Sequence, residues 1–141
     1  MVIKLDMSKA YNRVGWGYLK AVMENLGFAP KWVSMIMSCV TSVSYSFLIN
    51  QEPMGYIILS RGLHQGDPIS PYLFLLCAEG LTTLLKNAKH RKHIIGVIVG
   101  WGGPKLTHLF FADDSILFCR VETEECQNIM SLLGTYEEAS G

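Results

Sequence analysis

Residues 106–119 read LTHLFFADDSILFC, a stretch in which two apolar runs are separated by the carboxylate pair Asp113 and Asp114. Each run is short and rich in aromatic and β-favouring residues, so the stretch is typical of a β-hairpin. One interpretation of the acidic pair is structural, because Asp tolerates turn geometry by bonding nearby backbone N–H groups. Two adjacent anions between apolar strands also repel each other unless a cation is present. Whether the pair is a turn or part of a metal site depends on a third carboxylate.

Length and composition indicate one domain with a sizeable core, since the chain has 141 residues and half of them are apolar or aromatic. Twelve Lys and Arg residues balance twelve Asp and Glu residues, so the net charge indicates neither a nucleic-acid binder nor an acidic partner. Basic residues nevertheless cluster within residues 86–93, and acids gather within residues 122–138. For the basic cluster a solvated helix end is the default interpretation, and phosphate contact is the alternative.

The four cysteines, at positions 39, 77, 119 and 126, lack CxxC spacing and lie mostly among apolar neighbours. We expect reduced core residues in an intracellular protein, nuclear or cytoplasmic and not secreted. His90 and His93 have no partners of suitable spacing for a zinc site. We expect no membrane association, because no signal pattern is present and the longest apolar run, residues 72–85, is too short to span a bilayer and contains Glu79.

The order of the hydrophobic patterns predicts an α+β fold. A strand-like run over residues 2–5 is followed directly by Asp6, and residues 43–50 and 54–59 predict a second hairpin. A further short strand is expected at residues 94–99, and helical spacing at residues 16–26, 30–40, 72–85 and 122–138. We therefore expect an antiparallel sheet with helices packed on one face. Because a native domain seldom begins inside a core strand, we also expect a truncated chain.

Residues 60–71, SRGLHQGDPISP, contain two glycines and two prolines and predict an irregular loop between apolar elements. Asp6 and Asp113 are far apart in the sequence, but a sheet can bring a strand end beside a hairpin tip. Three carboxylates meeting there would repel one another when empty and would bind divalent cations through hard oxygen ligands. Two such ions about 3.5–4 Å apart serve in-line phosphoryl transfer. The residues alone leave the metal site and the structural turn as alternatives.

Three segments resemble the palm motifs of reverse transcriptases from non-LTR, LINE-type retrotransposons. They are Leu5-Asp-Met-Ser-Lys-Ala-Tyr-Asn12, Arg61-Gly-Leu-His-Gln-Gly-Asp-Pro-Ile-Ser-Pro-Tyr-Leu-Phe74 and Phe111-Ala-Asp-Asp114. The resemblance covers essentially the whole chain, and the middle motif is highly specific. It implies that residues 1–141 are a reverse-transcriptase palm domain, truncated at both ends, with the fingers and thumb largely missing.

The resemblance implies an RNA-directed DNA polymerase that extends a primer 3′-hydroxyl by two-metal nucleotidyl transfer. It implies two Mg²⁺ ions as cofactors, for which Mn²⁺ can substitute, and an RNA template, a DNA primer and deoxynucleoside triphosphates as partners. The segment would then come from a longer polyprotein with fingers, thumb and other domains. The alternative is a folded but inactive retroelement remnant that binds nucleic acid weakly, and a group II intron maturase fits the motifs less well. We expect low activity from the isolated chain.

Site residues are carried over only where this sequence matches the family motifs. Asp6 and Asp113 resemble the two principal metal-binding aspartates and Asp114 the adjacent carboxylate, so these three are the predicted catalytic and metal-binding residues. The residues predicted to bind nucleotide or template are Tyr11, Arg61, Gln65 and Gly66. Tyr11 matches an aromatic position under the incoming sugar, with a packed core tyrosine as its structural alternative. Arg61, like Lys9, either contacts phosphates or faces solvent.

Three residues depart from the family pattern without touching the metal carboxylates. Asn12 stands where a second Asp is common, and as a helix N-cap Asn would be equivalent. Gly15 replaces a commonly acidic residue beside Trp16, which weakens that helix start by up to about 1 kcal/mol. His64 stands where a permanently charged Arg is common, and an unperturbed imidazole is mostly neutral at physiological pH.

Overall fold

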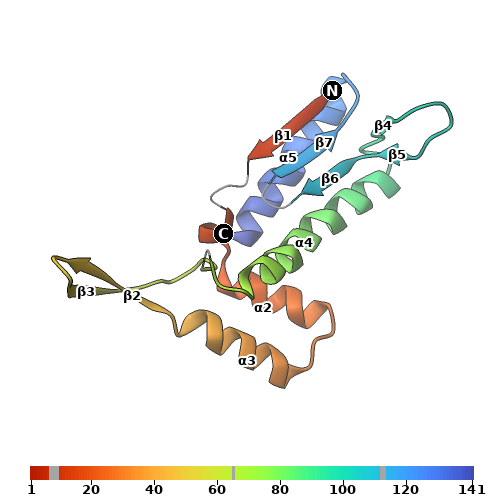
Figure 1. Ribbon diagram of the computed structural model, residues 1–141. Coiled ribbons are helices and arrows are strands. Elements are labelled where there is room, and N and C mark those ends of the chain that lie inside the picture. Colours follow the sequence, from red (N-terminus) through yellow and green to blue (C-terminus); the bar gives the residue numbers. More distant parts are fainter. Residues whose placement is uncertain (7–9, 65, 112–113) are drawn as a thin grey trace.

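The computed structural model describes residues 1–6, 10–64, 66–111 and 114–141. In chain order its elements are β1 (Val2–Asp6), α1 (Ala10–Arg13), α2 (Trp16–Asn25), α3 (Pro30–Thr41), β2 (Ser44–Ile49), β3 (Glu52–Ile58), α4 (Ser70–His90), β4 (Val97–Ile98), β5 (Lys105–Leu106), β6 (His108–Phe111), β7 (Asp114–Phe118) and α5 (Thr123–Ser140). The fold therefore mixes helices with antiparallel strands, as the sequence predicted. In Figure 1 the β2–β3 hairpin extends away from the other elements.

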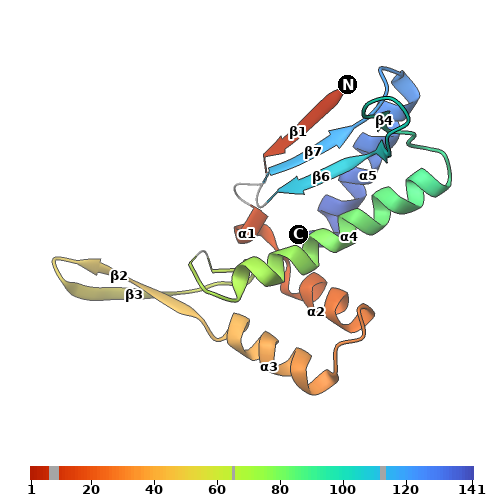
Figure 2. The same cartoon turned by 45° about the vertical axis from the view of Figure 1, so that its right-hand side comes forward.

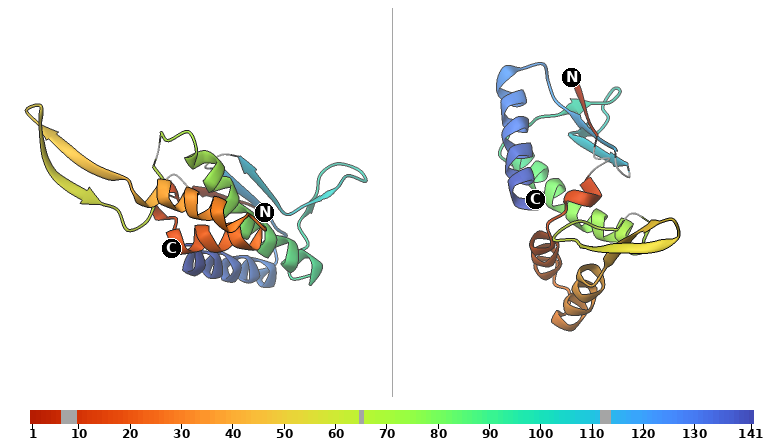
Figure 3. Two further views of the ribbon diagram at one scale, coloured as in Figure 1. Left: turned by 90° about the horizontal axis from the view of Figure 1, so that it is seen from below. Right: turned by 90° about the vertical axis from the view of Figure 1, so that its left-hand side faces the viewer.

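The central sheet has the strand order β1–β7–β6, and both pairs are antiparallel. Successive side chains of a strand point to opposite faces, and β7 follows this rule closely. Ser115 and Leu117 are buried on one face, whereas Ile116 and Phe118 are only half-buried on the other. Helices α4 and α5 lie along the buried face (Figure 3), so one face of the sheet is covered and the other is open.

Two hydrophobic clusters form the core, and α4 contributes to both. The first cluster lies between α2, α3 and the start of α4, and it includes Leu19, Met23, Ile36, Leu73 and Phe74. The second lies under the sheet and includes Leu81, Leu85, Ile94, Leu117 and Ile129. Figure 2 shows α4 running from the α2–α3 pair to the far end of the sheet. Helix α4 thereby joins the two clusters into one body.

The β2–β3 hairpin is exposed along nearly its whole length. Its turn residues Asn50 and Gln51 have φ angles of +53° and +68°, the positive values that a type I′ hairpin turn requires. Its exposed side chains are mostly large and apolar, including Leu48, Tyr56 and Ile58. The hairpin is held in register by its own strand pairing and not by burial against the core.

Several expected details were wrong. A single sheet was expected, whereas the described strands form three separate antiparallel sheets. Helix α4 continues past residue 85 to His90, because Lys86, Ala88 and Lys89 are good helix formers and Ala88 is buried. The strand expected at residues 94–99 shrinks to β4, because Gly96 takes a positive φ of +73° and turns the chain against the Leu106 carbonyl.

All four cysteines are free thiols, as predicted, but not all are core residues. Cys77 and Cys119 are buried and Cys126 is half-buried, whereas Cys39 is exposed on α3. The apolar stripe of α3 faces the core through Val33 and Ile36, and position 39 lies outside that stripe. None of the helices in the described part of the chain is both long and apolar enough to cross a bilayer.

Candidate functional site

Asp6 ends β1, Asp114 begins β7, and the antiparallel register makes these two residues Cα partners. Opposite residues of an antiparallel pair have Cα atoms about 4.5–5.5 Å apart. The backbone therefore brings two of the three predicted carboxylate residues to facing positions at one end of the sheet. The third, Asp113, lies outside the described residues, although it directly precedes Asp114 in the chain.

Asp114 forms an ion pair with Lys4 that the sequence reasoning missed. The Lys4 Nζ lies 3.1 Å from Asp114 Oδ1, and the two side chains are 65% and 46% exposed. An exposed pair of this kind contributes about 0–1 kcal/mol, so the ammonium is only weakly held. Strand alternation could have revealed it, because Lys4 precedes Asp6 by two residues and so belongs to the same face of β1.

The loop before α4 is joined to α1 by backbone hydrogen bonds. The Leu63 N–H donates to the Tyr11 carbonyl at 2.7 Å, and the Gly62 N–H donates to the Val14 carbonyl at 2.8 Å. Gly62 has a φ of +97°, and a Cβ at this position would lie 2.9 Å from the Asn12 carbonyl oxygen. Glycine is therefore required twice over, by conformation and by space. The first and middle motifs thus meet in three dimensions through main-chain contacts.

Tyr11 is half-buried, and its ring stacks on Phe74 with centroids 4.4 Å apart and planes inclined by 14°. This is the packing expected of a core tyrosine, and aromatic pairs of this kind contribute about 0.5–1.5 kcal/mol beyond burial. Contact of Tyr11 with an incoming sugar stays a prediction.

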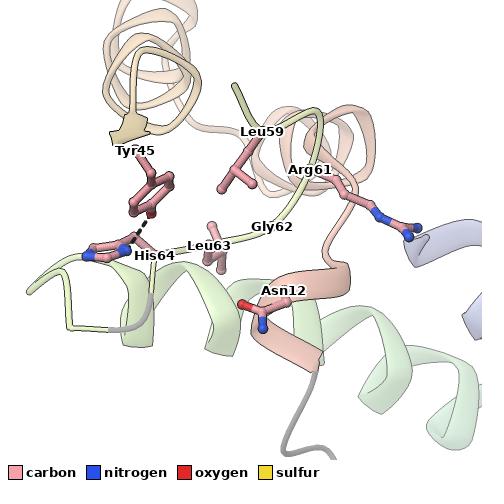
Figure 4. A pocket seen from close by; sticks show the side chains of 7 residues that line it. All are labelled: Asn12, Tyr45, Leu59, Arg61, Gly62, Leu63 and His64. Carbon is pink, nitrogen blue, oxygen red and sulfur yellow. Dashed lines mark hydrogen bonds between the residues drawn. The ribbon is translucent and has the colours of Figure 1, made fainter. Parts of the chain in front are cut away.

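An open hollow of about 480 Å³ lies between the loop, α1 and the start of β2. Figure 4 shows its lining residues, which are Asn12, Tyr45, Leu59, Arg61, Gly62, Leu63 and His64. The Tyr45 hydroxyl and His64 Nδ1 share a hydrogen bond of 2.5 Å across it. Arg61 is exposed and extends toward the C-terminus, where its Nη1 donates to the Gly141 carbonyl at 3.1 Å.

Among the remaining predicted residues, the structure describes Gly66 and Asn12 but not Gln65 or Lys9. Gly66 has a φ of +103° with open space around its missing Cβ, so its glycine is required by conformation alone. Gln65 and Lys9 lie outside the described residues. The expectation that Asn12 caps a helix was wrong, because Asn12 lies within α1 and the N-cap of α2 is Gly15, without a side-chain cap.

No cluster of three or more His, Cys, Asp or Glu side chains suited to a metal occurs within residues 1–6, 10–64, 66–111 and 114–141. The predicted triad includes Asp113, so this search does not test it. The carboxylates at positions 6 and 114 supply hard oxygen donors, which Mg²⁺ prefers, and their backbone positions face each other. The described half of the site therefore fits a divalent cation in residue type and in register.

A second group of titratable side chains, away from the aspartates, is structural. The hydroxyls of Tyr18 and Tyr136 both donate to the Cys77 carbonyl, at 3.1 and 3.2 Å. Burial raises the pKa of the Cys77 thiol to about 12, so the thiol stays protonated at physiological pH. Cys77 is also only 1% exposed, so it packs as a core side chain.

The whole chain, residues 1–141, matches the family model described as reverse transcriptase (RNA-dependent DNA polymerase). It is 27% identical over 132 residues, 90% of its length, to an uncharacterized 149 kDa protein of transposon TX1 from Xenopus laevis. It is 28% identical over 116 residues, 82% of its length, to a retrovirus-related Pol polyprotein from the type-1 retrotransposable element R2 of Popillia japonica. Over 69 residues, 49% of its length, it is 48% identical to an uncharacterized mitochondrial protein of Arabidopsis thaliana. These matches span 10%, 18% and 57% of the three relatives, respectively.

Proposed function

Because this chain belongs to the reverse transcriptase family, with relatives among non-LTR retrotransposon proteins, we propose that it is the palm of a LINE-type RNA-directed DNA polymerase. The observation that carries the proposal is the register of the central sheet, in which Asp6 and Asp114 are Cα partners. The Asp114 side chain is 46% exposed and so does not belong to the core. The pairing suits a site that must gather carboxylates around a cation.

In the proposed reaction a primer 3′-hydroxyl oxygen attacks the α-phosphorus of a deoxynucleoside triphosphate, and pyrophosphate leaves. Asp6, Asp113 and Asp114 would hold two Mg²⁺ ions through carboxylate oxygens. When bound, these ions supply charge stabilisation for the attacking and leaving oxygens. Lys4 keeps a positive charge beside Asp114 at 3.1 Å and would release that carboxylate when it binds a cation. RNA template, DNA primer and nucleotides are the proposed partners.

The loop from Arg61 to Gly66 would form the nucleotide and template side of the site. Its backbone is fixed against α1 through Leu63 and Tyr11, so the loop has a defined place beside the first motif. Gly66 leaves room for close approach of a ligand, since no atom of the described residues beyond its chain neighbours lies within 4 Å of its missing Cβ. Gln65 would contact the nucleotide or template, and Tyr11 would lie under the sugar.

A second candidate function is that of a folded, non-catalytic retroelement remnant. The observation in its favour is that two departures from the family pattern, Asn12 and His64, line the same hollow of about 480 Å³ (Figure 4). The resemblance implies Asp at the first position and Arg at the second. Their replacement removes one negative and one permanent positive charge from a single region beside the proposed site.

Primer extension on an RNA template with a fluorescent DNA primer, scoring single-nucleotide addition, separates the two candidates. Asp113→Asn should lower addition by about 10²–10³-fold, the loss typical of removing one group that stabilises transition-state charge. Glu138→Gln, an exposed change of equal charge on α5, should leave it unchanged. Equal addition by wild type and Asp113→Asn would contradict the polymerase. Addition by the wild type that Asp113→Asn abolishes would support the polymerase and contradict the remnant, even if the activity of the isolated chain is low.

A further inference from the structure

At the end of the central sheet farthest from Asp6 and Asp114, Lys and Arg residues outnumber Asp and Glu residues, although Glu122 and Glu124 at the start of α5 lie at this end too. Between Glu79 and Asp113 the sequence contains no Asp or Glu but includes five Lys or Arg residues and three of the four His residues. The five cations are Lys86, Lys89, Arg91, Lys92 and Lys105. The chain as a whole has a formal net charge of zero, so this is segregation of charge and not an overall bias. Figure 1 shows the end of α4 and the β4–β5 pair together at this end of the molecule.

The cations from separate elements form one surface. Lys89 Nζ on α4 donates to the Lys105 carbonyl on β5 at 3.0 Å, which joins the helix end to the β4–β5 pair. Lys105 and Arg120 both line an open hollow of about 300 Å³ whose other walls are residues 95–98. Arg120 lies 3.5 Å from Glu122 in an exposed pair, a weak restraint on its guanidinium.

Helix α5 supports this surface through hydrogen bonds to the segment before β4. The carboxylate of Glu125, 4% exposed, accepts hydrogen bonds from the N–H groups of Ile95 and Gly96 at 2.9 and 3.1 Å. Asn128 Nδ2 donates to the His93 carbonyl at 3.1 Å. Helix α5 therefore holds the segment before β4 at three backbone atoms. Residues 95 and 96, which line the hollow beside Lys105 and Arg120, are therefore fixed against α5.

An exposed aromatic side chain lies in the segment that joins β4 to β5. Trp101 lies in the glycine-rich turn between β4 and β5, and its indole is fully exposed. Exposed Trp residues are rare on soluble domains because the indole buries a large apolar area when it can. Cations combined with an exposed aromatic face are the combination that binds single-stranded nucleic acid, since phosphates pair with Lys and Arg and bases stack on the ring.

We propose that Lys89, Lys105, Arg120 and Trp101, the distal basic surface, bind single-stranded nucleic acid. The cations pair with phosphates, the hollow of about 300 Å³ receives part of the backbone, and a base stacks on Trp101. The binding needs no metal and none of the aspartates, because it takes place at the opposite end of the sheet. It therefore goes beyond the proposed polymerase site and stands whether or not that site is active.

Fluorescence anisotropy with a labelled oligouridylate in EDTA tests the proposal on the 141-residue chain. Trp101→Ala should raise the Kd by about 5–100-fold, the range for loss of one stacked base, and Trp101→Phe should restore most of the affinity. The double change Lys89→Gln with Lys105→Gln should also raise the Kd. This double change should also reduce the slope of log K against log[salt] by roughly 0.7 for each phosphate that the protein no longer neutralises.

Two controls accompany these variants. Lys20→Gln with Lys31→Gln removes the same charge from exposed positions of α2 and α3 and should leave the Kd unchanged within about twofold. Glu138→Gln, a loss of one charge at an exposed position of α5, should also leave oligouridylate binding unchanged. Far-UV circular dichroism confirms that each variant is folded.

The proposal is overturned if the Trp101→Ala and the double lysine variants bind oligouridylate as wild type does. It is also overturned if the double lysine change weakens binding to vesicles of phosphatidylcholine with phosphatidylserine but not to oligouridylate. The surface would then be an electrostatic membrane contact.

Discussion

The two ends of the β1–β7–β6 sheet carry opposite charge on one scaffold. At one end Asp6 and Asp114 are Cα partners across β1 and β7, and Lys4 forms an ion pair with Asp114. At the other end Lys89 and Lys105 meet where α4 joins β5. The acidic end is assembled from residues at opposite ends of the chain, so only the folded sheet creates it. The basic end comes mainly from one continuous stretch and is already visible as a local run of charge.

The two ends are also held by different means. Backbone hydrogen bonds attach the loop at Gly62 and Leu63 to α1 near the acidic end. A buried carboxylate, Glu125, supports the basic end by accepting two backbone N–H groups. Substitutions can therefore disturb one end and spare the other, which makes the contrast between them testable.

The largest loss of stability is expected from a core residue on which both ends of the sheet depend. Leu117 is fully buried in the middle of the sheet, so Leu117→Ala should destabilise the fold by about 3 kcal/mol through reduced burial and a cavity. Leu48→Ala, a change of the same size at a 72% exposed hairpin position, should cost no more than about 0.5 kcal/mol. Urea denaturation measures both. Equal losses would contradict the placement of the core.

Glu125→Ala should disturb the basic end alone. It leaves the Ile95 and Gly96 N–H groups without their acceptor, a loss of about 2 kcal/mol, whereas Glu125→Gln retains an acceptor oxygen and should cost less. Glu125 Oε2 has no hydrogen-bond partner in the described part of the chain, so Gln forfeits nothing there. Hydrogen exchange at the two amides reports the effect. Unchanged exchange in Glu125→Ala would contradict the anchoring role.

A pair of glycine substitutions should disturb the acidic end. Gly62→Ala and Gly66→Ala both place a Cβ at a positive φ, which costs about 1 kcal/mol each. Gly62→Ala should cost more, about 2 kcal/mol in total, because its Cβ also meets the Asn12 carbonyl whereas Gly66 has open space. Chemical denaturation of both variants compares them. Equal losses would show that the contact between the loop and α1 contributes nothing.

The smallest expected effect is a change in the pKa of His108, which lies at the basic end of the sheet. Burial lowers the pKa of His108 below its ordinary value of 6.5, and Lys86 and Lys89 lower it further while Glu79 opposes them. The folded state therefore binds this proton less readily than the unfolded state, and stability falls as the pH drops through 6.5 toward the folded pKa. Replacing Lys86 and Lys89 with Gln should raise the His108 pKa in an NMR titration. An unchanged or lower pKa would contradict the local positive field.

The fold was predictable from sequence where the pattern is local. The runs on either side of Asp113 predicted the hairpin that became β6 and β7, and three-to-four-residue spacing predicted α2, α3 and α5. The end of α4 was missed because the apolar stripe that marked the helix stops at Leu85, whereas the helix continues through Lys86 and Lys89 and buries Ala88. Sequence spacing carries no information about such tertiary packing.

The residues of the candidate site were predictable from the sequence, but the contacts that their side chains make were not. Strand order alone left the meeting of Asp6 with the Asp113–Asp114 turn as one of two alternatives, and the resemblance made it the expectation. The register that pairs Asp6 with Asp114 depends on the whole sheet. The Lys4 ion pair and the anchoring role of Glu125 were missed. Glu125 precedes Ile129 by four residues and so shares the buried stripe of α5, which was the available signal.

Thermal unfolding with and without Mn²⁺ tests the proposed metal site at the acidic end most directly. A cation that binds only the folded state, at about ten times its Kd, stabilises by about 1.4 kcal/mol and should raise the Tm by roughly 3–6 °C. Asp113→Asn should lose most of this rise, whereas Glu138→Gln, of equal charge change, should keep it. No rise in the wild type, or an equal rise in Asp113→Asn, would contradict a carboxylate metal site at Asp6, Asp113 and Asp114.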